Sequence, residues 1–511
     1  MDIKKVAIIG GGTAGWLAAN HLGKALCNKD DISITLIESP DVPPIGVGEG
    51  TVPDIKKTLL SFGISETDFI RECDATFKQS IKFVNWMDKK EHGENNFFHH
   101  LFDVPLRNEA NLLTSHWLSE KKDVCCYAEM LSSQHKICEE GLAPKSITTP
   151  EYQGDLAYAY HLNAAKFAKL LASNAKSKYF VKHLLANITG VNLSEDGSIF
   201  SLTTDSQGEL EFDFYIDCSG FDSILINKAL KVPFKDVSKT LLVNRALVVQ
   251  VPTAADAEIP PYTVATAHQA GWIWDIALSS RRGVGLVYSS SHMSDEEAEE
   301  KLDNYLGESK QNLTYRTIPM KIGYREKFWH KNCVALGLAQ GFLEPLEATS
   351  ILLTDFSAEI LAQRFPSSTA QLAQLEKRFN HSMVYAWDRV VDFIKLHYCI
   401  SDRTDSEFWV DNKKSATIPM SLQEKLALWE SYIPISDDFF SHFEVFFLEN
   451  FLFVLYGMGF KTKLKNDRLP VCKTSLAMIN QRKEITNHLQ KMLPRHRDLL
   501  DKIKQFGLQS L

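Results

Sequence analysis

A glycine-rich turn close to the N-terminus constrains the fold of this chain more than any other feature. The apolar run Val6–Ile9 predicts a buried parallel strand, leads directly into Gly10-x-Gly12-x-x-Gly15, and is followed by helical spacing over 17–22. In such a strand–turn–helix, glycine allows a tight bend and the close approach of a pyrophosphate, which the free N–H groups of the helix start then bind. The sequence therefore predicts a dinucleotide-binding turn, which includes Thr13 and Ala14.

Glu38 supplies the acidic residue that a dinucleotide site of this kind requires. It ends a second apolar run, 32–37, and lies about twenty residues after the last glycine of the turn, which is the usual spacing. A carboxylate at this position accepts hydrogen bonds from a ribose. Because the strand, the helix and the acid all occur where they are expected, a chance glycine turn is a weak alternative.

The composition is that of a globular protein. The 511 residues are 44% hydrophobic and 23% charged, and their formal net charge of -8 offers no basic surface, which excludes a nucleic-acid partner. The nine cysteines form neither a C-x-x-C pair nor a zinc spacing, so we expect reduced thiols, a cytoplasmic protein and no metal site. The longest apolar run, Phe451–Phe460, is too short to cross a membrane, and no membrane partner is expected.

A second glycine-rich segment, 43–53, follows Glu38 along the chain. Three glycines surround Glu49, a pattern that indicates either backbone lying close to a ligand or a flexible connector. Thr51 is expected to cap a helix that begins near Asp54.

The alternating residues of Phe77–Trp86 predict a strand. Taken alone, Lys78 in this strand is expected to be a solvated surface lysine. The aromatic segment 95–102 carries His99 and His100. No third ligand at a zinc spacing accompanies the two histidines, so packing or substrate contact is favoured over a metal.

Two β-rich blocks interrupt the nucleotide-binding frame. Asp196-Gly197 and Gln207-Gly208 predict hairpin turns in the first block. In the second block Trp272, Trp274 and Ile276 share one face of a strand, either as core residues or as a wall beside a planar flavin. Such antiparallel insertions are typical of large FAD domains, whereas a pure NAD domain needs repeated alternation of strand and helix.

A strand–turn–helix over 334–351 and a helical region complete the predicted architecture. In FAD enzymes a second turn of this type contacts the flavin, which makes Leu338 and Ile351 candidate cofactor residues, and its helix start can bind an anion. An apolar stripe over 369–400 predicts a long helix. We expect an α/β (α+β) fold, with an FAD-binding Rossmann-like domain and a β-rich insertion over 1–365 and a mainly helical substrate or cap domain over 366–511. An aromatic-rich, substrate-facing insertion is expected at about 86–150.

Several longer motifs resemble those of the flavin-dependent tryptophan halogenases. They are spread along nearly the whole chain, over 10–16, 46–53, 217–221, 271–276, 341–349 and 397–403. The family's Trp-x-Trp-x-Ile-Pro signature appears as Trp272, Trp274 and Ile276, but Ala277 replaces the proline. This departure suggests a branch away from the best-known members.

The resemblance implies a two-component reaction. A separate flavin reductase supplies FADH2, oxygen and halide react with it to give hypohalous acid, and this electrophile crosses the protein to halogenate an indole-type aromatic substrate. FAD is therefore the implied cofactor, chloride or bromide is the implied co-substrate, and a homodimer is an assembly that is common in the family.

The resemblance also assigns roles to single residues. Lys78 matches the catalytic lysine and Glu347 the catalytic glutamate, while Thr349 and Ser350 match the halide site, where glycine is more usual at the second position. An ammonium can bind and activate hypohalous acid, and a carboxylate can stabilise a cationic ring and take its proton. The matched indole clamp is His100 and Phe102, and the matched cofactor residues are Gly10, Gly12, Thr13, Ala14, Gly15, Glu38, Glu49, Leu338 and Ile351.

Two other functions stay open on the sequence alone. A two-component flavin aromatic monooxygenase would hydroxylate an aromatic ring, but it would not need Lys78 and Glu347 together. A non-catalytic FAD-binding protein is the other alternative, and the retention of both residues argues against it. The apolar segment around Phe446 and Phe451 offers little charge for an amino acid. Our hypothesis is therefore an indole or a larger indole-bearing substrate, with free tryptophan a poor one.

Overall fold

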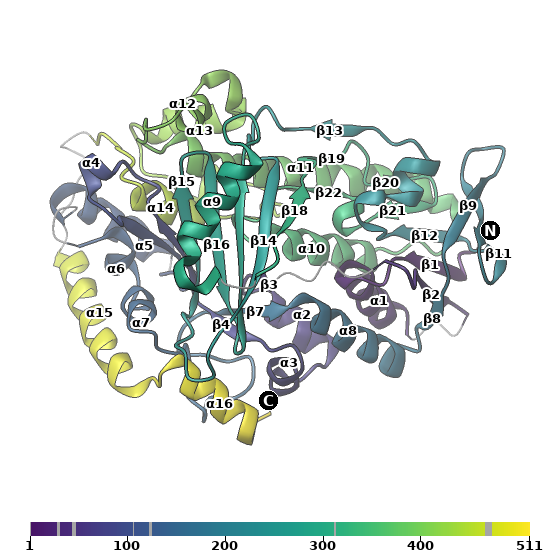
Figure 1. The fold of residues 1–511 in the computed structure, drawn as a ribbon, viewed down its shortest axis with the longest axis horizontal. Coiled ribbons are helices and arrows are strands. Elements are labelled where there is room, and N and C mark those ends of the chain that lie inside the picture. The colour runs from purple at the N-terminus through teal and green to yellow at the C-terminus, as the bar shows by residue number, and fades with distance from the viewer. Residues whose placement is uncertain are drawn as a thin grey trace.

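The computed structural model describes residues 2–27, 31–42, 48–105, 107–121, 125–310, 313–464 and 473–510. The described part combines several β-sheets with helices that cover them, and the C-terminal region is helical (Figure 1). This is the mixed α/β architecture that the sequence predicts. Within the described residues, no helix is both long enough and apolar enough to cross a membrane.

The nucleotide-binding frame is a six-stranded sheet in the order β20-β21-β12-β1-β2-β8, on the right in Figure 1. Its strands are β20 (Trp329–His330), β21 (Cys333–Ala335), β12 (Phe214–Asp217), β1 (Lys5–Ile9), β2 (Ser33–Glu38) and β8 (Lys182–Leu185), and all neighbours are parallel except β20 and β21. The buried strand β1 leads into α1 (Thr13–Leu26), which packs against α8 (Ala164–Tyr179) and α10 (Thr349–Gln363). This arrangement confirms the Rossmann-like prediction.

A seven-stranded sheet forms the centre of the molecule, in the order β18-β14-β17-β16-β15-β5-β6. Its strands are β18 (Arg316–Pro319), β14 (Arg245–Pro252), β17 (Arg281–Tyr288), β16 (Gly271–Ala277), β15 (Tyr262–His268), β5 (Ser80–Val84) and β6 (Phe97–Leu101). Neighbours are antiparallel except β15 and β5, which run parallel and pair Thr263 with Ile81. This sheet carries the predicted tryptophan strand as β16.

Three small sheets complete the strand set. β3 (Gly48–Gly50), β7 (Ala159–Asn163) and β4 (Thr76–Lys78) form one antiparallel sheet, in which Gly50 and Thr76 pair on either side of His161. β9 (Ile188–Leu193), β10 (Ile199–Thr204) and β11 (Gly208–Glu211) form the hairpins that the two glycine dipeptides predict. The third sheet consists of β13 (Phe234–Asp236), β19 (Gly323–Arg325) and β22 (Gly341–Phe342).

Shorter helices connect the sheets. They are α2 (Ile55–Phe62), α3 (Glu66–Glu72), α4 (Lys89–His92), α5 (Arg107–His116), α6 (Tyr127–Leu131), α7 (Gln134–Glu139) and α9 (Asp295–Leu306). Two local expectations are wrong. Asp54, and not Thr51, is the residue before α2, because the Thr51 hydroxyl donates instead to the Tyr160 carbonyl at 2.9 Å. The predicted strand Phe77–Trp86 is divided at Gln79, whose backbone pairs with Pro261 and Phe102.

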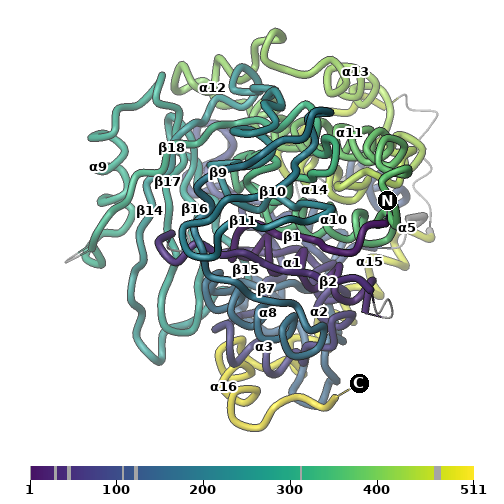
Figure 2. The backbone as a smooth tube through the Cα atoms, turned by 90° about the vertical axis from the view of Figure 1, so that its right-hand side faces the viewer, coloured from purple at the N-terminus to yellow at the C-terminus, as the bar shows by residue number. Residues whose placement is uncertain are grey.

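The region after residue 366 is helical. The long predicted helix is α11 (Leu372–Cys399), and it is followed by α12 (Glu407–Asn412), α13 (Met420–Trp429), α14 (Leu448–Gly457), α15 (Lys473–Met492) and α16 (His496–Phe506). α14 packs on β6, α15 on α7, and α16 on α3, so the last helices return across the first half of the chain (Figures 1 and 2). One hydrophobic cluster includes residues from both sides of position 366, and the division into two domains there stays a prediction.

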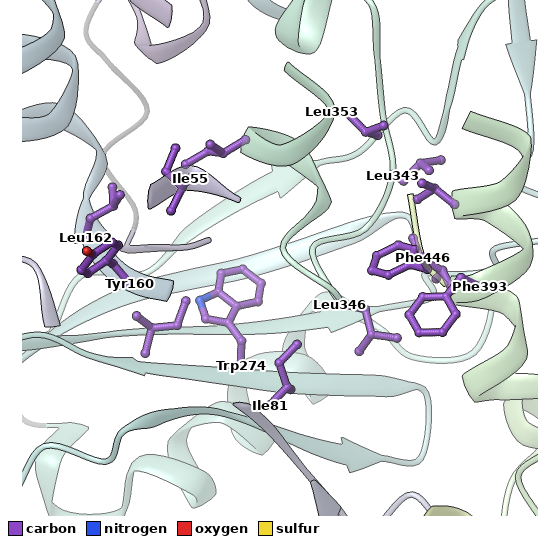
Figure 3. Packing of buried hydrophobic residues seen from close by; sticks show 14 of the residues in the cluster. Ile55, Ile81, Tyr160, Leu162, Trp274, Leu343, Leu346, Leu353, Phe393 and Phe446 are labelled. Atoms are coloured by element: carbon purple, nitrogen blue, oxygen red, sulfur yellow. The ribbon is translucent and has the colours of Figure 1, made fainter. Parts of the chain in front are cut away.

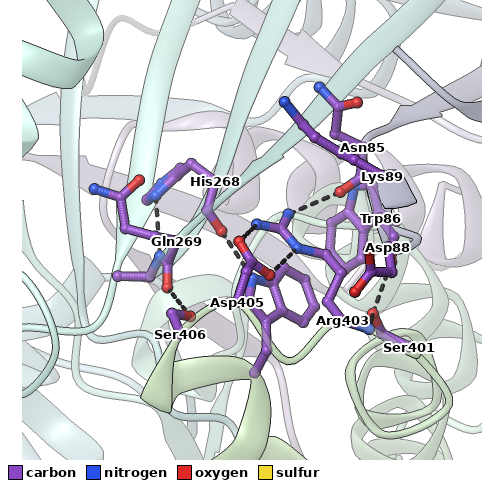
Figure 4. Close-up of polar contacts among 12 residues, drawn as sticks. Asn85, Trp86, Asp88, Lys89, His268, Gln269, Ser401, Arg403, Asp405 and Ser406 are labelled. Carbon is purple, nitrogen blue, oxygen red and sulfur yellow. Dashed lines mark hydrogen bonds and ion pairs between the residues drawn. The ribbon is translucent and has the colours of Figure 1, made fainter. Parts of the chain in front are cut away.

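Arg403 attaches the segment after α11 to the β5 end of the central sheet (Figure 4). Its guanidinium donates to the Asp405 carboxylate at 2.8 and 2.7 Å and to the Asn85 carbonyl at 2.7 Å. The Ser401 hydroxyl donates to the Trp86 carbonyl at 2.7 Å. The end of the 397–403 motif therefore has a structural role, because it fixes the C-terminal end of α11.

Candidate functional site

The first glycine turn has the geometry of a dinucleotide site. Gly10 has φ +116°, and a Cβ there would lie 2.2 Å from the Cys218 carbonyl oxygen. A Cβ on Gly15 would lie 1.9 Å from the Gly10 oxygen, whereas a Cβ on Gly12 would meet nothing within 4 Å. The turn therefore requires two glycines for its own packing and leaves open space beside the third. α1 begins at Thr13 against this space, where its first N–H groups can bind phosphate.

Glu38 lies beside this turn at the end of β2. A Cβ on Gly11 would lie 2.1 Å from the carboxyl carbon of Glu38, and the His183 ring contacts the same carboxylate at 2.8 Å. A substitution at Gly337, φ +62°, would place Cβ 2.5 Å from the Ala14 methyl group. The glycine turns at Gly10–Gly15 and Gly337 are thus in contact, and the side of the molecule that carries them is the predicted cofactor side.

A mainly apolar cavity begins on this side and extends toward the central sheet. Its lining is Gly48, Glu49, Gly50, Lys78, Ile81, Phe221, Ala246, Val248, Thr263, Trp272, Trp274, Ile276, Ile318, Met320, Leu338, Phe342, Pro345, Leu346, Ala348 and Ser350. The predicted face of β16, with both tryptophans and Ile276, forms one wall, which fits a planar aromatic cofactor ring. Of the predicted cofactor residues, Glu49 and Leu338 line the cavity, whereas Ile351 is buried and is not part of the lining, and their role in cofactor binding stays a prediction.

Glu49 is the carboxyl group of this cavity. The Glu49 side chain is partly exposed but is surrounded by protein. This burial raises the pKa of Glu49 to about 7. A neutral carboxyl group can donate a hydrogen bond as well as accept one. The segment around Glu49 is therefore a polar part of a cavity that is mainly apolar.

Lys78 lies at the end of β4, where it faces the cavity. Its side chain is 1% exposed, so the expectation of a solvated lysine, drawn from the strand alone, is wrong. The Nζ atom donates to the Thr51 carbonyl at 3.1 Å and lies 5.1 Å from the centre of the Phe102 ring. Burial lowers the pKa of Lys78 to about 8, against the opposing effect of Glu347. The structure thus places Lys78 and Phe102 together.

Glu347 is held by two histidines. Both carboxylate oxygens lie 3.0 Å from His100 Nδ1, and Oε1 lies 2.8 Å from His397 Nε2. Burial favours the neutral acid, but the two imidazoles outweigh it and lower the pKa of Glu347 to about 2. The carboxylate is therefore ionised throughout the physiological pH range.

The hydrogen bonds around Glu347 fix how the two rings are oriented. The Asn450 amide oxygen accepts from the Phe447 N–H at 2.8 Å, so the amide nitrogen donates to His100 Nε2 at 3.0 Å, and His100 donates from Nδ1 to Glu347. His397 Nδ1 lies 2.9 Å from the Phe393 carbonyl, so this ring faces an acceptor at each nitrogen. The sequence motif contains His397, but nothing in its spacing shows that it contacts Glu347.

Phenylalanine rings surround the Glu347 cluster. Phe393 stacks on Phe446 at 4.1 Å between ring centres and contacts His397 at 5.1 Å, and Phe453 lies 6.2 Å from His100. Figure 3 shows Leu346 lying between the cavity residues Trp274 and Ile81 on one side and the Phe393–Phe446 pair on the other. Leu346 and Lys78 line the cavity, whereas Glu347 and the two histidines that hold it are not part of the lining.

The predicted halide residues begin α10. Thr349 is buried and Ser350 lines the cavity, and Ala348 before them has φ +55°. The left-handed conformation of Ala348 ends the preceding loop abruptly and leaves the first N–H groups of the helix without intrahelical acceptors. Such a helix start favours an anion.

Glu344 is a second buried glutamate that the sequence analysis does not assign. Its Oε2 atom accepts from the Trp272 indole N–H at 2.8 Å and from the Tyr398 hydroxyl at 2.5 Å, and burial raises its pKa to about 7. It thereby ties the loop before Glu347 to both β16 and α11. The repeated glutamate in Glu344-Pro-Leu-Glu347 is the only sequence signal for this contact.

One group of potential metal ligands occurs in the described residues. Cys126, Glu129 and His135 place their ligand atoms within 4.8 Å of one another. The Cys126 sulfur lies 3.5 Å from His135 Nε2 and 3.8 Å from Nδ1, so it touches the edge of the ring and is not aligned with one lone pair. The expectation of a protein without a metal stays a prediction.

Comparisons with known proteins agree with the motifs. The family model described as tryptophan halogenase matches residues 5–473. Tryptophan 6-halogenase SttH of Streptomyces toxytricini is 34% identical over 476 residues, which are 89% of each chain. Tryptophan 7-halogenase RebH of Lentzea aerocolonigenes is 33% identical over 497 residues, 91% of this chain and 92% of RebH.

A solved structure extends the similarity to three dimensions. The tryptophan halogenase from Shewanella frigidimarina is 40% identical in sequence and superposes with a TM-score of 0.95, covering 100% of this chain and 99% of its own. The family match, the identities and the shared fold all extend over most of the chain. The protein therefore belongs to the tryptophan halogenase family.

Proposed function

We propose that the protein is a flavin-dependent halogenase that uses reduced FAD, oxygen and chloride or bromide to halogenate an indole-type aromatic substrate. The observation that carries the proposal is the position of Lys78. Its ammonium group is buried and faces the cofactor-side cavity, and Glu347 is close enough to influence its pKa. A base for the ring proton and a donor for the electrophile thus lie close enough for their charges to interact.

The residues of the cofactor side fit FAD. The glycine turn and the start of α1 would hold the pyrophosphate, Glu38 a ribose, and the tryptophan wall of β16 the flavin ring. When it is bound in its reduced form, FAD supplies, with oxygen and halide, the hypohalous acid of the reaction. The N–H groups at Thr349 and Ser350 would hold the halide ion beside the cavity.

The protons of the halogen transfer pass through Lys78 and Glu347. The carbon–halogen bond forms as the oxygen–halogen bond of hypohalous acid breaks, and the oxygen leaves as water after it takes a proton from the Lys78 ammonium. The cationic ring then loses its proton to the Glu347 carboxylate. Transfer of that proton back to Lys78 restores both groups, so that the net products are the haloarene and water.

The ionisation states of Lys78 and Glu347 favour these two roles. Glu347, with a pKa of about 2, is an anion that stabilises the cationic ring, and Lys78, with a pKa of about 8, is a cation that can release a proton more readily than an exposed lysine. His100 and Phe102 would contact the ring of the substrate, because each is adjacent to one of the two catalytic groups.

The substrate that we propose is an indole or a larger indole-bearing molecule, with free tryptophan a poor substrate. The stacked phenylalanines beside Glu347 support it, because they offer apolar contact and no partner for an amine or a carboxylate. A separate reductase as the source of reduced FAD and a homodimer in solution are part of the same proposal, and they rest on the family resemblance.

Product analysis tests this function. The protein is incubated with FAD, a flavin reductase, NADH, oxygen and bromide or chloride, against indole, substituted indoles and tryptophan, and products are identified by mass. We expect products with a halogen isotope pattern from indole-type substrates. The halogenated product should be at least ten times less abundant with tryptophan, and Glu347→Gln should abolish it.

Addition of one oxygen would replace the proposal by a monooxygenase. Oxidation of reduced FAD without any organic product would favour a non-catalytic protein, and efficient tryptophan halogenation would refute the substrate proposal alone.

A further inference from the structure

Another polar residue, Thr263, lines the same cavity as Lys78. Its side chain is 8% exposed and lines the cavity from β15, where Thr263 is paired with Ile81 of β5. The Thr263 hydroxyl lies 2.8 Å from His161 Nε2. Neither residue belongs to a motif of the sequence analysis or to the proposed mechanism.

His161 connects Thr263 to Lys78 through Gly50. A Cβ built on Gly50 would lie 3.2 Å from the Lys78 Nζ atom and 3.7 Å from the His161 Cδ2 atom. The Cδ2 atom adjoins Nε2, the nitrogen that contacts Thr263. The ammonium and the imidazole edge therefore both lie beside Gly50 in the small sheet β3–β7–β4, and the Thr263 hydroxyl contacts the same imidazole from β15.

The hydrogen bonds of His161 indicate where its proton is. The ring is completely buried, and its Nδ1 atom has no hydrogen-bond partner among the described residues. Burial first, and then the charge of Lys78, lower the pKa of His161 well below its usual value, so the ring is neutral and carries one N–H. An orphaned buried N–H is rarer in proteins than an orphaned buried acceptor. The proton is thus placed on Nε2, which donates to the Thr263 oxygen.

The Nε2–H tautomer of His161 determines whether the Thr263 hydroxyl is free to donate a hydrogen bond. When the hydroxyl oxygen accepts from His161, the hydroxyl hydrogen is free to donate, and within the part of the chain that the structure describes no acceptor takes it. The side chain faces the cavity that Lys78 also faces. The cavity therefore presents the Lys78 N–H and the Thr263 O–H as donors, while most of its other lining residues are apolar.

We infer that the Thr263 hydroxyl, oriented by His161, is a second hydrogen-bond donor that holds the oxygen of hypohalous acid beside Lys78. This inference rests on the proposed halogenase function. Hypohalous acid has an oxygen that can accept from both donors, and two donors fix its orientation better than one. No covalent bond forms in this step, so Thr263 is a binding residue for the electrophile and His161 is a positioning residue.

The composition of the cavity wall shows why the electrophile must be held. Trp272, Trp274 and Met320 line the same space and are side chains that hypohalous acid oxidises. In methionine oxidation the oxygen moves to sulfur while halide and a proton are released, which consumes the electrophile. A donor pair at Lys78 and Thr263 would keep the oxidant on the path to the substrate.

The test compares three variants of the full-length protein with the wild type. Thr263→Val removes the hydroxyl at nearly constant shape, Thr263→Ser keeps it, and Thr266→Val makes the same change three residues along β15, on the opposite face of the strand. Each is assayed for halogenated product per reduced FAD oxidised, for hypohalous acid trapped in solution, and for added oxygen on Met320 by peptide mass.

We expect Thr263→Val to lower product per FAD oxidised at least five-fold, with more trapped oxidant and more Met320 oxidation, while Thr263→Ser stays within two-fold of the wild type and Thr266→Val equals it. Equal coupling and equal Met320 oxidation in wild type and Thr263→Val would overturn the inference. Failure of the wild type to halogenate any indole would instead refute the proposed function, so the two failures are distinguishable.

Discussion

The buried lysine on β4 has a charge that depends on its surroundings. In water a lysine keeps its proton until about pH 10.4, but burial lowers the pKa of Lys78 to about 8. A lowered pKa means that the ammonium exists below about pH 8 and is lost as the pH rises through that value. The proposed proton donor therefore disappears within a range that is accessible to an assay.

We predict that halogenated product per reduced FAD oxidised falls as the pH rises through about 8, because the neutral amine no longer protonates the leaving oxygen. The ratio is measured from pH 6.5 to 9.5, and the same indole is treated with free hypohalous acid in parallel to correct for titration of the oxidant itself. A corrected ratio that stays constant across this range would contradict the role of the ammonium.

At the scale of single residues, the family resemblance suggested catalytic roles, but the sequence did not show which residues contact one another. Lys78 and Glu347 were matched through the family resemblance, and their catalytic roles stay predictions. The strand around Lys78 alone predicts a solvated side chain, because a three-residue strand at the edge of a small sheet carries no sign of its burial. His161, Thr263 and His397 could not be selected, since each acts through a partner more than forty residues away in sequence.

At the scale of elements, the sheet β3–β7–β4 places the polar part of the site. It brings Gly50, His161 and Lys78 together, and the strand β7 is fixed from behind by a buried ion pair. Lys145 Nζ lies 3.0 Å from Glu66 Oε2, and both side chains are completely buried. The Tyr160 hydroxyl of β7 donates to the other oxygen of Glu66 at 2.6 Å. The ion pair thus helps to hold the strand that carries His161.

Lys145→Met is expected to lower the free energy of unfolding by about 3–5 kcal/mol, because it leaves the Glu66 carboxylate buried without a cation. Urea denaturation followed by circular dichroism measures the change. The double variant Glu66→Gln, Lys145→Met should regain part of the loss, since it removes the unpaired charge. A loss below about 1 kcal/mol in the single variant would show that the pair has little importance for stability.

Helices and strands with a clear hydrophobic period were predictable from the sequence, but the points where they begin, end or break were not. The strand and helix of the first turn, the hairpins near Gly197 and Gly208, and the long helix α11 agree with the sequence to within a few residues, because their patterns extend over several residues. The break at Gln79 and the use of Thr51 depend on hydrogen bonds to other strands. Such contacts come from tertiary structure and leave no local pattern.

At the scale of the whole molecule, the site is assembled from segments that are distant in sequence. Residues near 50, 78, 100, 347, 397 and 450 meet between the central sheet, α10, α11 and α14. The return of the C-terminal helices across the first half of the chain makes this assembly possible (Figures 1 and 2). The FAD side was predictable because its turn is local, whereas the substrate side depends on how α11 and α14 pack.

In the proposed reaction, the molecule as a whole keeps the cofactor and the substrate apart. Leu346 and Lys78 line the cavity beside β16, whereas Glu347 and the histidines that hold it are not part of its lining. Replacement of Lys78 should leave the cavity beside β16 intact but stop halogenation of the substrate beside Glu347. Flavin oxidation and halogenation can therefore be measured separately in one reaction.

The most direct test of the account is the amount of halogenated indole formed per reduced FAD oxidised by Lys78→Ala, measured beside the wild type in bromide. We predict that FAD binding and the rate of oxidation of reduced FAD stay within about two-fold of the wild type, while the ratio falls at least a hundred-fold, about 2.7 kcal/mol in transition-state stabilisation. A Lys78→Ala protein that halogenates with an undiminished ratio would contradict the account.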